Sequence, residues 1–303
     1  MIIISSKFGQ LANRLFLFAH FVGFAIEHNL TIINPAFEEY AQFFEPTCND
    51  LLCRYPVNPL QFPIHQRMRI AVYEFFRALA AGVNKTKVFN SIFGVLRLPE
   101  NQPENQLENQ PENQEDDLSS PEFLDLVTQK KVLLVKGWLF RDNANFIKHG
   151  DKIRDYFTPI ASHRSPVNSL ICTARQSCQV LIGIHIRQGD YADFMGGKYF
   201  YTVAQYIQLM EKVEALFPNQ QVAFLICSNV QQNPEDFSSF NVTFATHHLV
   251  EDLYSLAQCD YLMGTVSTYT LWASFYGKVQ LYMIQDLDRS PSIADFLNYG
   301  VEP

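Results

Sequence analysis

Two stretches in which short apolar strands alternate with helical segments predict an α/β fold with two Rossmann-like domains. In the first stretch, a strand at residues 2–4 is followed by a polar loop, a helix over residues 13–28 and a strand at residues 31–33. In the second, residues 178–290 follow the order βαβαβαβ. Strands that are joined by helices run parallel within one sheet. The sequence therefore predicts two domains with mostly parallel sheets.

The predicted first domain comprises residues 1–165. Its helix over residues 13–28 is apolar on almost every side, which is typical of a buried helix, and Asn29 can end it in the left-handed conformation. The other predicted elements are an irregular Pro-rich segment over residues 50–63, a helix over 64–83, a strand over 131–135 and a helix over 145–157.

A polar repeat interrupts this domain. Residues 99–114 contain four near-identical tetrapeptides with one apolar residue besides proline, Leu107, and an acidic run follows at Glu115. Such a composition cannot build a hydrophobic core. We therefore expect residues 99–118 to form a disordered surface insertion that arose by repeat expansion.

The predicted second domain comprises residues 166–303. Apolar residues at spacings of three and four indicate one face of a helix over residues 203–217. The remaining predicted elements are strands over residues 180–186, 222–227, 261–264 and 279–284, and helices over residues 251–257 and 267–276.

Composition limits the partners of the protein. The chain has 303 residues, 48% of them hydrophobic, and a formal net charge of −8. This acidity argues against nucleic acid or an anionic membrane as the main partner, although a local basic cluster can still bind an anion. No secretory signal is visible, and the most apolar stretch, Leu15 to Ile26, is too short to span a bilayer. The six cysteines form no C-x-x-C pair, so reduced thiols and a cytoplasmic location are expected.

The residues that end the first strand of the second domain are the most informative in the chain. An apolar run that starts at Val180 leads into His185, Arg187 and Asp190. Such a strand is buried on both faces of a parallel sheet, and ligands bind beyond the carboxyl ends of these strands. The pattern therefore predicts functional roles for the three polar residues. An Arg–Asp pair that closes a surface turn is the alternative.

Two more strand ends are predicted to meet the first. Ser228 and Asn229 follow the second strand, and Ser267 and Thr268 stand at a helix N-terminus after the third. Unpaired N–H groups at a helix N-terminus bind phosphate, and the guanidinium of Arg187 suits a diphosphate. The three ends together predict a nucleotide-diphosphate ligand, whereas an ordinary N-cap is the simpler interpretation of Ser267-Thr268 alone.

These motifs resemble a known family. The segment His185-Ile-Arg-Gln-Gly-Asp-Tyr191 is similar to the H-x-R-R-x-D motif of α-1,2-fucosyltransferases, which α-1,6- and protein O-fucosyltransferases share more loosely. Other matches, in the same order along the chain, are Gly9-Gln-Leu-Ala-Asn-Arg-Leu-Phe16 with G-G-L-G-N-Q-x-F, Gly137-Trp138 and the later Ile153-Arg-Asp-Tyr-Phe157 with the G-Y-W segment and its helix, Glu251-Asp-Leu-Tyr254 with E-D-L-Y/F, and Ser267-Thr-Tyr-Thr-Leu-Trp272 with S-S/T-F-S-W-W.

The resemblance implies a GT-B-like fold in which the two domains face a central cleft, with GDP-fucose bound mainly by the second. It implies fucosyl transfer to a hydroxyl of a glycan acceptor, α-1,2 to galactose, with inversion and without a metal or other cofactor. The implied catalytic residues are Arg187, His185 and Asp190. The implied substrate-binding residues are Asn13, Gly9, Arg14, Ser228, Asn229, Ser267, Thr268, Tyr269 and Trp138.

The chain departs from the family pattern at four positions. Gln188 stands in place of the second motif arginine, Ala12 in place of a loop glycine, Arg14 in place of Gln and Leu271 in place of a tryptophan. Arg187, Asn13 and Ser267 remain, so donor binding is expected, whereas the linkage and the acceptor are less well defined.

Several alternatives stay open. Asp286 and Asp288 have the D-x-D spacing of metal-dependent glycosyltransferases, and Asp190, Asp193 and Glu251 are candidates for the general base. A non-catalytic sugar-nucleotide or glycan-binding relative and a phosphoester hydrolase are the rival functions. Peripheral contact with lipid-linked glycans is compatible with the sequence.

Overall fold

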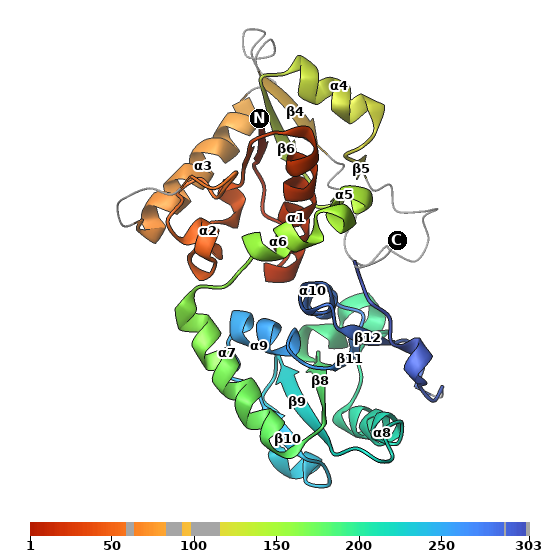
Figure 1. The fold of residues 1–303 in the computed structure, drawn as a ribbon. Helices are drawn as coiled ribbons and strands as arrows, with labels where there is room; N and C mark the ends of the chain where they lie inside the picture. The colour runs from red at the N-terminus through yellow and green to blue at the C-terminus, as the bar shows by residue number, and fades with distance from the viewer. Residues whose placement is uncertain (59–63, 83–92, 98–115, 288, 301–303) are drawn as a thin grey trace. The chain divides into compact units, whose positions relative to one another are not determined.

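The computed structural model describes residues 1–58, 64–82, 93–97, 116–287 and 289–300. These residues form two compact units, one that ends at Ile160 and one that begins at Ala161 (Figure 1). The division precedes the expected boundary at residues 165 and 166, which lies inside helix α7 (Ala161–Ala174). Because a continuous helix is a poor place for a linker, the unit begins where the helix does.

The central sheet of the first unit has the order β3-β2-β1-β6-β4. The strands β1 (Ile2–Ile4), β2 (Ile32–Ile33), β6 (Val132–Lys136) and β4 (Phe93–Arg97) run parallel, and β3 (Arg54–Tyr55) pairs with β2 in the antiparallel sense. The expectation of an irregular segment throughout residues 50–63 is therefore wrong at β3, where two residues pair with β2 and form the edge of the sheet. The strand β4 was not predicted.

Helices of the first unit are α1 (Leu11–His28), α2 (Glu45–Cys48), α3 (Gln66–Gly82), α4 (Pro121–Gln129), α5 (Asn143–Lys148) and α6 (Gly150–Tyr156). The buried helix α1 starts two residues earlier than predicted, and Asn29 ends it in the left-handed conformation as predicted. The single helix predicted over residues 145–157 is wrong. It is two helices that meet at His149, whose backbone angles of −104° and 16° depart from those of a helix, and the first helix begins at the N-cap Asp142.

The residues after the polar repeat belong to the fold. Residues 99–115 lie outside the described residues, but β5 (Asp116–Asp117) pairs with β7 (Phe140–Arg141), and Leu118 is fully buried. The prediction that the disordered insertion extends to residue 118 is therefore wrong. A leucine that is removed from water anchors this end of the segment.

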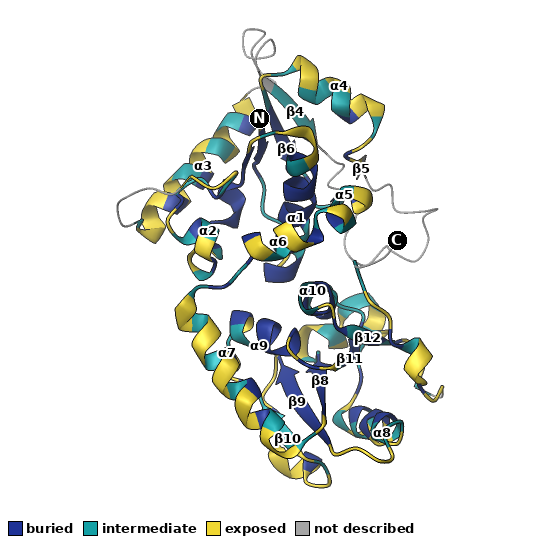
Figure 2. Cartoon of the chain, in the orientation of Figure 1, coloured by how far each residue is buried: buried dark blue, intermediate teal, exposed yellow. Residues whose placement is uncertain are grey.

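The second unit contains a five-stranded parallel sheet in the order β10-β9-β8-β11-β12. Its strands are β8 (Val180–Ile186), β9 (Val222–Ser228), β10 (Val242–Phe244), β11 (Tyr261–Thr265) and β12 (Gln280–Ile284). The predicted βαβαβαβ order is confirmed, with β10 as an additional edge strand. Figure 2 shows β8 and β9 buried along their length, as two covered faces require.

Helices cover both faces of this sheet. On one face, α8 (Val203–Glu214) packs Tyr206, Leu209 and Met210 against even-numbered residues of β8 and β9. On the other face lie α7, α9 (Leu249–Leu256) and α10 (Thr268–Gly277). Odd-numbered side chains of β8, among them His185, point to this second face. Within the described residues, no helix has both the length and the apolar character needed to cross a bilayer.

Candidate functional site

The carboxyl ends of β8, β9 and β11 lie at one edge of the second sheet, because these strands are adjacent and parallel. From β8 the chain builds outward through β9 and β10, then crosses to β11 and β12 on the other side. The order of the strands thus reverses between β8 and β11. Ligands of doubly wound sheets bind at this reversal, and Arg187 and Ser267 stand on its two sides.

Arg187 is held by its own loop. Its Nη2 atom lies 2.6 Å from Oδ2 of Asp190, and its guanidinium carbon lies 5.2 Å from the centre of the Tyr191 ring. The Nε atom is buried and has no hydrogen-bond partner among the described residues. A buried cationic N–H without an acceptor is unfavourable, and a bound anion would remove that penalty.

His185 lies beneath this loop. It is 4% exposed, its Nδ1 atom is 2.8 Å from Oγ1 of Thr270, and its ring centre is 4.8 Å from that of Tyr269. Burial, with a smaller contribution from the charge of Arg187, lowers the pKa of His185 to about 3. The imidazole is therefore neutral at neutral pH, and it supports the end of β8 from within.

The N-terminus of α10 is capped by the residue that the sequence pointed to. Oγ of Ser267 accepts a hydrogen bond from the backbone N–H of Tyr269 at 3.2 Å, and Thr268 is half-buried in the first turn. The hydroxyl of Tyr191 donates to the carbonyl of Val266 at 2.9 Å. The loop of Arg187 and the start of α10 are thus directly joined.

Ser228 and Asn229 bond within the protein. Oγ of Ser228 accepts from Nε2 of Gln232 at 3.0 Å and from the backbone N–H of Val230 at 3.2 Å. The side chain of Asn229 bonds to both backbone groups of Gln188 and to Asp190. These contacts bring the end of β9 against the loop of Arg187.

The predicted residues of the first unit lie beyond β1 and β6, which are neighbouring parallel strands. Gly9 has a φ of +58°, and a Cβ atom there would lie 2.1 Å from Nδ2 of Asn13, so this turn requires glycine. The guanidinium of Arg14 lies 2.8 Å from Oε2 of Glu39 and 5.0 Å from the ring of Tyr40.

Trp138 follows β6 in the same unit. The guanidinium carbon of Arg141 lies 5.6 Å from the centre of its ring, and Nη1 of Arg141 donates to its carbonyl at 2.7 Å. The half-buried indole is thus held against the residues after the strand.

Comparison with known proteins places the chain in a family. The profile of glycosyl transferase family 11 matches residues 114–288, more than half of the sequence. The chain belongs to glycosyl transferase family 11. This confirms the resemblance that the motifs indicated. No curated protein matches the sequence.

Solved structures share the fold of this family 11 chain. A mutant of Arabidopsis thaliana FUT1 in complex with GDP aligns with a TM-score of 0.56 and 15% identity over 93% of this chain and 70% of that one. NodZ alpha-1,6-fucosyltransferase soaked with GDP-fucose aligns with a TM-score of 0.54 and 16% identity, over 93% of this chain and 94% of that one. POFUT1 in complex with GDP-fucose aligns with a TM-score of 0.52 and 10% identity over 96% of each chain. The α/β fold of two Rossmann-like units is that of these GT-B-like proteins.

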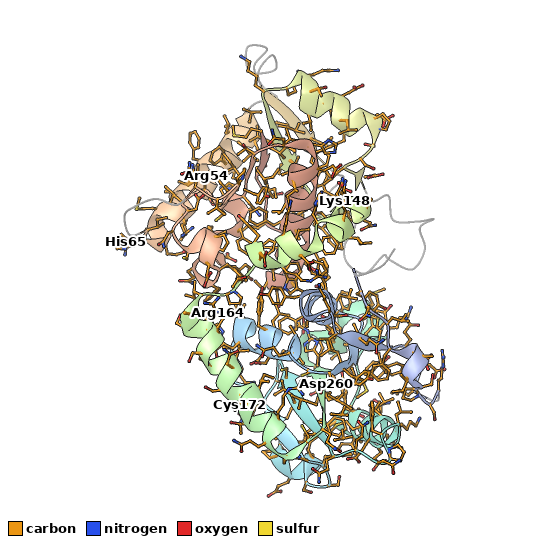
Figure 3. All side chains as sticks on the ribbon, viewed as in Figure 1. Arg54, His65, Lys148, Arg164, Cys172 and Asp260 are labelled. Atoms are coloured by element: carbon orange, nitrogen blue, oxygen red, sulfur yellow. The ribbon has the colours of Figure 1, made fainter. Side chains whose placement is uncertain are left out.

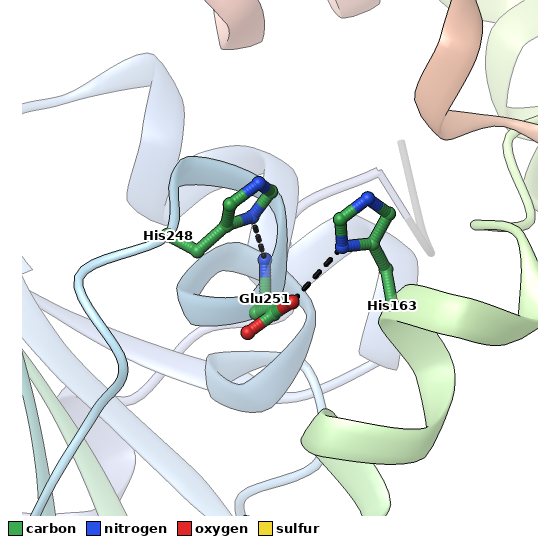
Figure 4. A group of neighbouring side chains, drawn as sticks. All are labelled: His163, His248 and Glu251. Atoms are coloured by element: carbon green, nitrogen blue, oxygen red, sulfur yellow. Dashed lines mark hydrogen bonds and ion pairs between the residues drawn. The ribbon is translucent and has the colours of Figure 1, made fainter.

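The family 11 chain has one cluster at this edge that sequence reasoning found only in part. Nδ1 of His163, in the first turn of α7, lies 2.9 Å from Oε1 of Glu251 (Figure 4). Oε2 of Glu251 accepts from Oγ1 of Thr246 at 2.9 Å. The rings of His163 and His248 stack with centres 4.5 Å apart. Nδ1 of His248 accepts from the backbone N–H groups of Val250 and Glu251 and so caps α9.

The geometry of this cluster favours a hydrogen-bonded pair of His163 and Glu251 over a metal centre. Potential ligand atoms of His163, His248 and Glu251 lie within 4.8 Å of one another. A zinc ion needs nitrogen lone pairs that converge on one point at about 2.1 Å. The ring planes are only 20° apart and stacked, so their in-plane lone pairs lie in nearly parallel planes and do not point at an ion between the rings. Two N–H groups already point at Nδ1 of His248.

The candidate bases differ in their surroundings. Asp190 is paired with Arg187. Burial would raise the pKa of Glu251, but the hydrogen bonds from His163 and Thr246 outweigh it and lower this pKa. Burial raises the pKa of Asp252, the next residue of the E-D-L-Y motif, to about 6. Asp252 is the carboxylate that sequence reasoning missed, and its position on the buried face of α9 was the available signal.

A shallow depression along α7 is separate from these strand ends. It is lined by residues of α7 alone, among them Arg164, Asn168 and Cys172. Figure 3 labels Arg164 and Cys172 on this helix. A surface formed by one helix offers no converging groups, and it is not a candidate for the predicted ligand.

Proposed function

We propose that this protein transfers L-fucose from GDP-fucose to a hydroxyl of a glycan acceptor, with α-1,2 linkage to galactose and inversion at the fucosyl carbon. Membership of glycosyl transferase family 11 supports a glycosyl transfer. The GDP-fucose named for NodZ and POFUT1 supports the choice of donor. The motif resemblance supports the linkage and the stereochemistry.

The observation that carries the proposal is the hydrogen bonding of the Arg187 guanidinium. Its Nη2 atom is engaged by Asp190, while its buried Nε lacks a partner among the described residues. This cation stands at the reversal point of the sheet, and the N-terminus of α10 follows the adjacent strand. A diphosphate between these two groups would accept the Nε hydrogen bond and meet the positive end of the helix dipole.

The chemistry places charge where this site can stabilise it. When the bond between the fucosyl carbon and the phosphate oxygen breaks, both electrons of the bond go to GDP. The β-phosphate then carries additional negative charge, which Arg187 is positioned to stabilise. The oxygen of the acceptor hydroxyl attacks the opposite face of the sugar, which inverts the carbon, and the proton of the hydroxyl is released to a base or to solvent. The neutral imidazole of His185 adds no competing positive charge beside Arg187.

We propose that the reaction needs no metal ion. Arg187 and the N–H groups of α10 supply the positive charge that a divalent cation would otherwise provide. The carboxylate of Asp190 is used by Arg187, and the parallel rings of His163 and His248 do not converge on one point. Asp286 follows β12, an edge strand that pairs with β11 and not with β8, the strand that leads to Arg187. Asp288 lies outside the described residues.

The test is acceptor-dependent release of GDP. The full chain is incubated with GDP-fucose and a panel of β-galactosides, and GDP release is measured with the linkage of the product determined by NMR. We expect release that depends on acceptor and an α-1,2-linked product, with GDP-mannose inactive. Release of GDP without acceptor would indicate a hydrolase, and binding of GDP-fucose without turnover would indicate a binding protein.

A further inference from the structure

Two amide side chains after β9 hold the residue that follows Arg187. Oδ1 of Asn229 accepts from the backbone N–H of Gln188 at 2.8 Å, and its Nδ2 donates to the carbonyl of the same residue at 2.9 Å. Nε2 of Gln232 donates to Oε1 of Gln188 at 3.1 Å. Both the backbone and the side chain of Gln188 are therefore bound from the neighbouring strand end.

The orientation of these amides is determined by backbone carbonyls. Nε2 of Gln232 also lies 3.0 Å from the carbonyl of Val230 and 3.0 Å from Oγ of Ser228, so its two hydrogens are shared among three acceptors. Nε2 of Gln188 donates to the carbonyl of Tyr201 at 3.2 Å. A carbonyl can only accept, so each nitrogen must be where it is assigned. The oxygen of Gln188 consequently faces an amide donor. Gln232 is 8% exposed, so loss of this contact would leave a buried polar group without a partner and destabilise the protein.

The contacts continue to Arg187. The second hydrogen of Nδ2 of Asn229 points to Oδ1 of Asp190 at 3.3 Å, and Oδ2 of Asp190 binds Nη2 of Arg187 at 2.6 Å. Both hydrogens of this amide are thereby used inside the protein. The connection runs from the end of β9 through Asn229 and Asp190 to the guanidinium.

We propose that Asn229 and Gln232 are positioning residues that hold the Arg187 loop ready for the nucleotide diphosphate, and that Gln188 is the residue through which they act. This inference rests on the proposed function for the identity of the ligand. It also explains why glutamine is compatible with position 188, where the family motif has arginine. A second guanidinium there would direct its N–H donors at the N–H donors of Gln232.

The first experiment compares adjacent glutamines. Gln232→Ala removes the buried donor, and Gln231→Ala, at an exposed position, is the matched control. If the loop must be ordered before the donor binds, the apparent affinity falls in proportion to the fraction of molecules in which the loop is ordered. We therefore expect the KM for GDP-fucose to rise about 10-fold in Gln232→Ala. We expect kcat to stay within about 3-fold, because Arg187 still contacts the diphosphate once it is bound.

The second experiment is a double-mutant cycle. Gln188→Arg alone should raise the KM for the donor, and Gln188→Arg combined with Gln232→Ala should raise it little further than either single substitution, as a coupled pair requires. Tighter donor binding by Gln188→Arg alone, additive effects in the double variant, or a fall in kcat with unchanged KM in Gln232→Ala would overturn the proposal.

Hydrogen exchange of the ligand-free protein tests the positioning without activity. A peptide that covers residues 187–192 should exchange faster in Gln232→Ala and Asn229→Ala than in Gln231→Ala. Equal exchange in all of them refutes the positioning role even if the enzyme is a fucosyltransferase. Faster exchange in a chain that does not turn over GDP-fucose would instead refute the proposed function and leave the hold on the loop established.

Discussion

Nδ1 of His185 lies 2.8 Å from Oγ1 of Thr270, so a buried imidazole joins the end of β8 to the first turn of α10. Both groups are removed from water. This contact connects the strand that carries Arg187 with the helix whose N-terminus we assign to phosphate. The contact holds the end of β8 against α10 whether or not either side chain touches the ligand.

Thr270→Val should destabilise the second unit. The substitution keeps the shape but leaves Nδ1 of His185 without its partner, which costs about 1–3 kcal/mol for a buried polar group. Urea unfolding measures the change. Thr173→Val, on the exposed side of α7, is the control and should stay within about 0.5 kcal/mol of wild type. An equal effect of both variants would show that the His185 contact contributes nothing.

Stability should fall as the pH decreases from the ordinary histidine range. Burial lowers the pKa of His20 and of His185 from 6.5 to about 3. Between these values the unfolded chain binds a proton at each position and the folded chain does not, so acid favours unfolding. Each histidine should contribute a slope of up to about 1.4 kcal/mol per pH unit. Unfolding free energies measured at pH 7, 6 and 5 should depend less steeply on pH in His185→Asn than in wild type. An unchanged pH dependence would contradict the lowered pKa of His185.

Arg187→Lys should reduce donor-dependent turnover by about 100-fold or more, because lysine lacks the planar fork that can bind Asp190 and a phosphate together. Arg77→Lys, at an exposed ion pair with Glu74, is the control. The measurement is kcat for GDP-fucose at saturating acceptor. Turnover near wild type in Arg187→Lys would remove this residue from the role of charge stabiliser.

Chelation should leave activity intact. We expect EDTA to change GDP-fucose turnover by less than about two-fold, because the site that we assign to the diphosphate relies on a guanidinium and helix N–H groups and not on the oxygen ligands that Mg²⁺ requires. Asp286→Ala should leave GDP-fucose turnover within about two-fold of wild type. Abolition by EDTA with recovery in Mn²⁺ or Mg²⁺, copied by Asp286→Ala, would favour a D-x-D mechanism instead.

Deletion of residues 99–113 should leave stability and turnover nearly unchanged, because the repeat has no apolar anchor except Leu107. Leu118→Ala, by contrast, should cost about 2–5 kcal/mol, since Leu118 is fully buried. Melting temperature and acceptor use are the measurements. A large loss on deletion of the repeat would show that it packs or binds.

The strands that carry the site could be predicted because their signal is local. Residues 180–186 and 222–227 are continuous apolar runs, and a run of that length followed by polar residues predicts a buried strand with a functional end. Elements that were missed have weaker local signals. The exposed face of α7 is polar, β3 has two residues, and the break at His149 is a local change of backbone angles that the apolar pattern does not contain.

The sequence by itself determined the fold class, the family and the polar residues at the ends of β8, β9 and β11. Only the tertiary structure decided which of these residues bond to one another. Gln188 and Asn229 are 41 positions apart, His185 and Thr270 85 positions, and His163 and Glu251 88 positions. A residue's periodicity and its immediate neighbours report whether it is buried. The partner of its hydrogen-bonding groups depends on which distant strand lies beside it, and packing of the whole sheet sets that order.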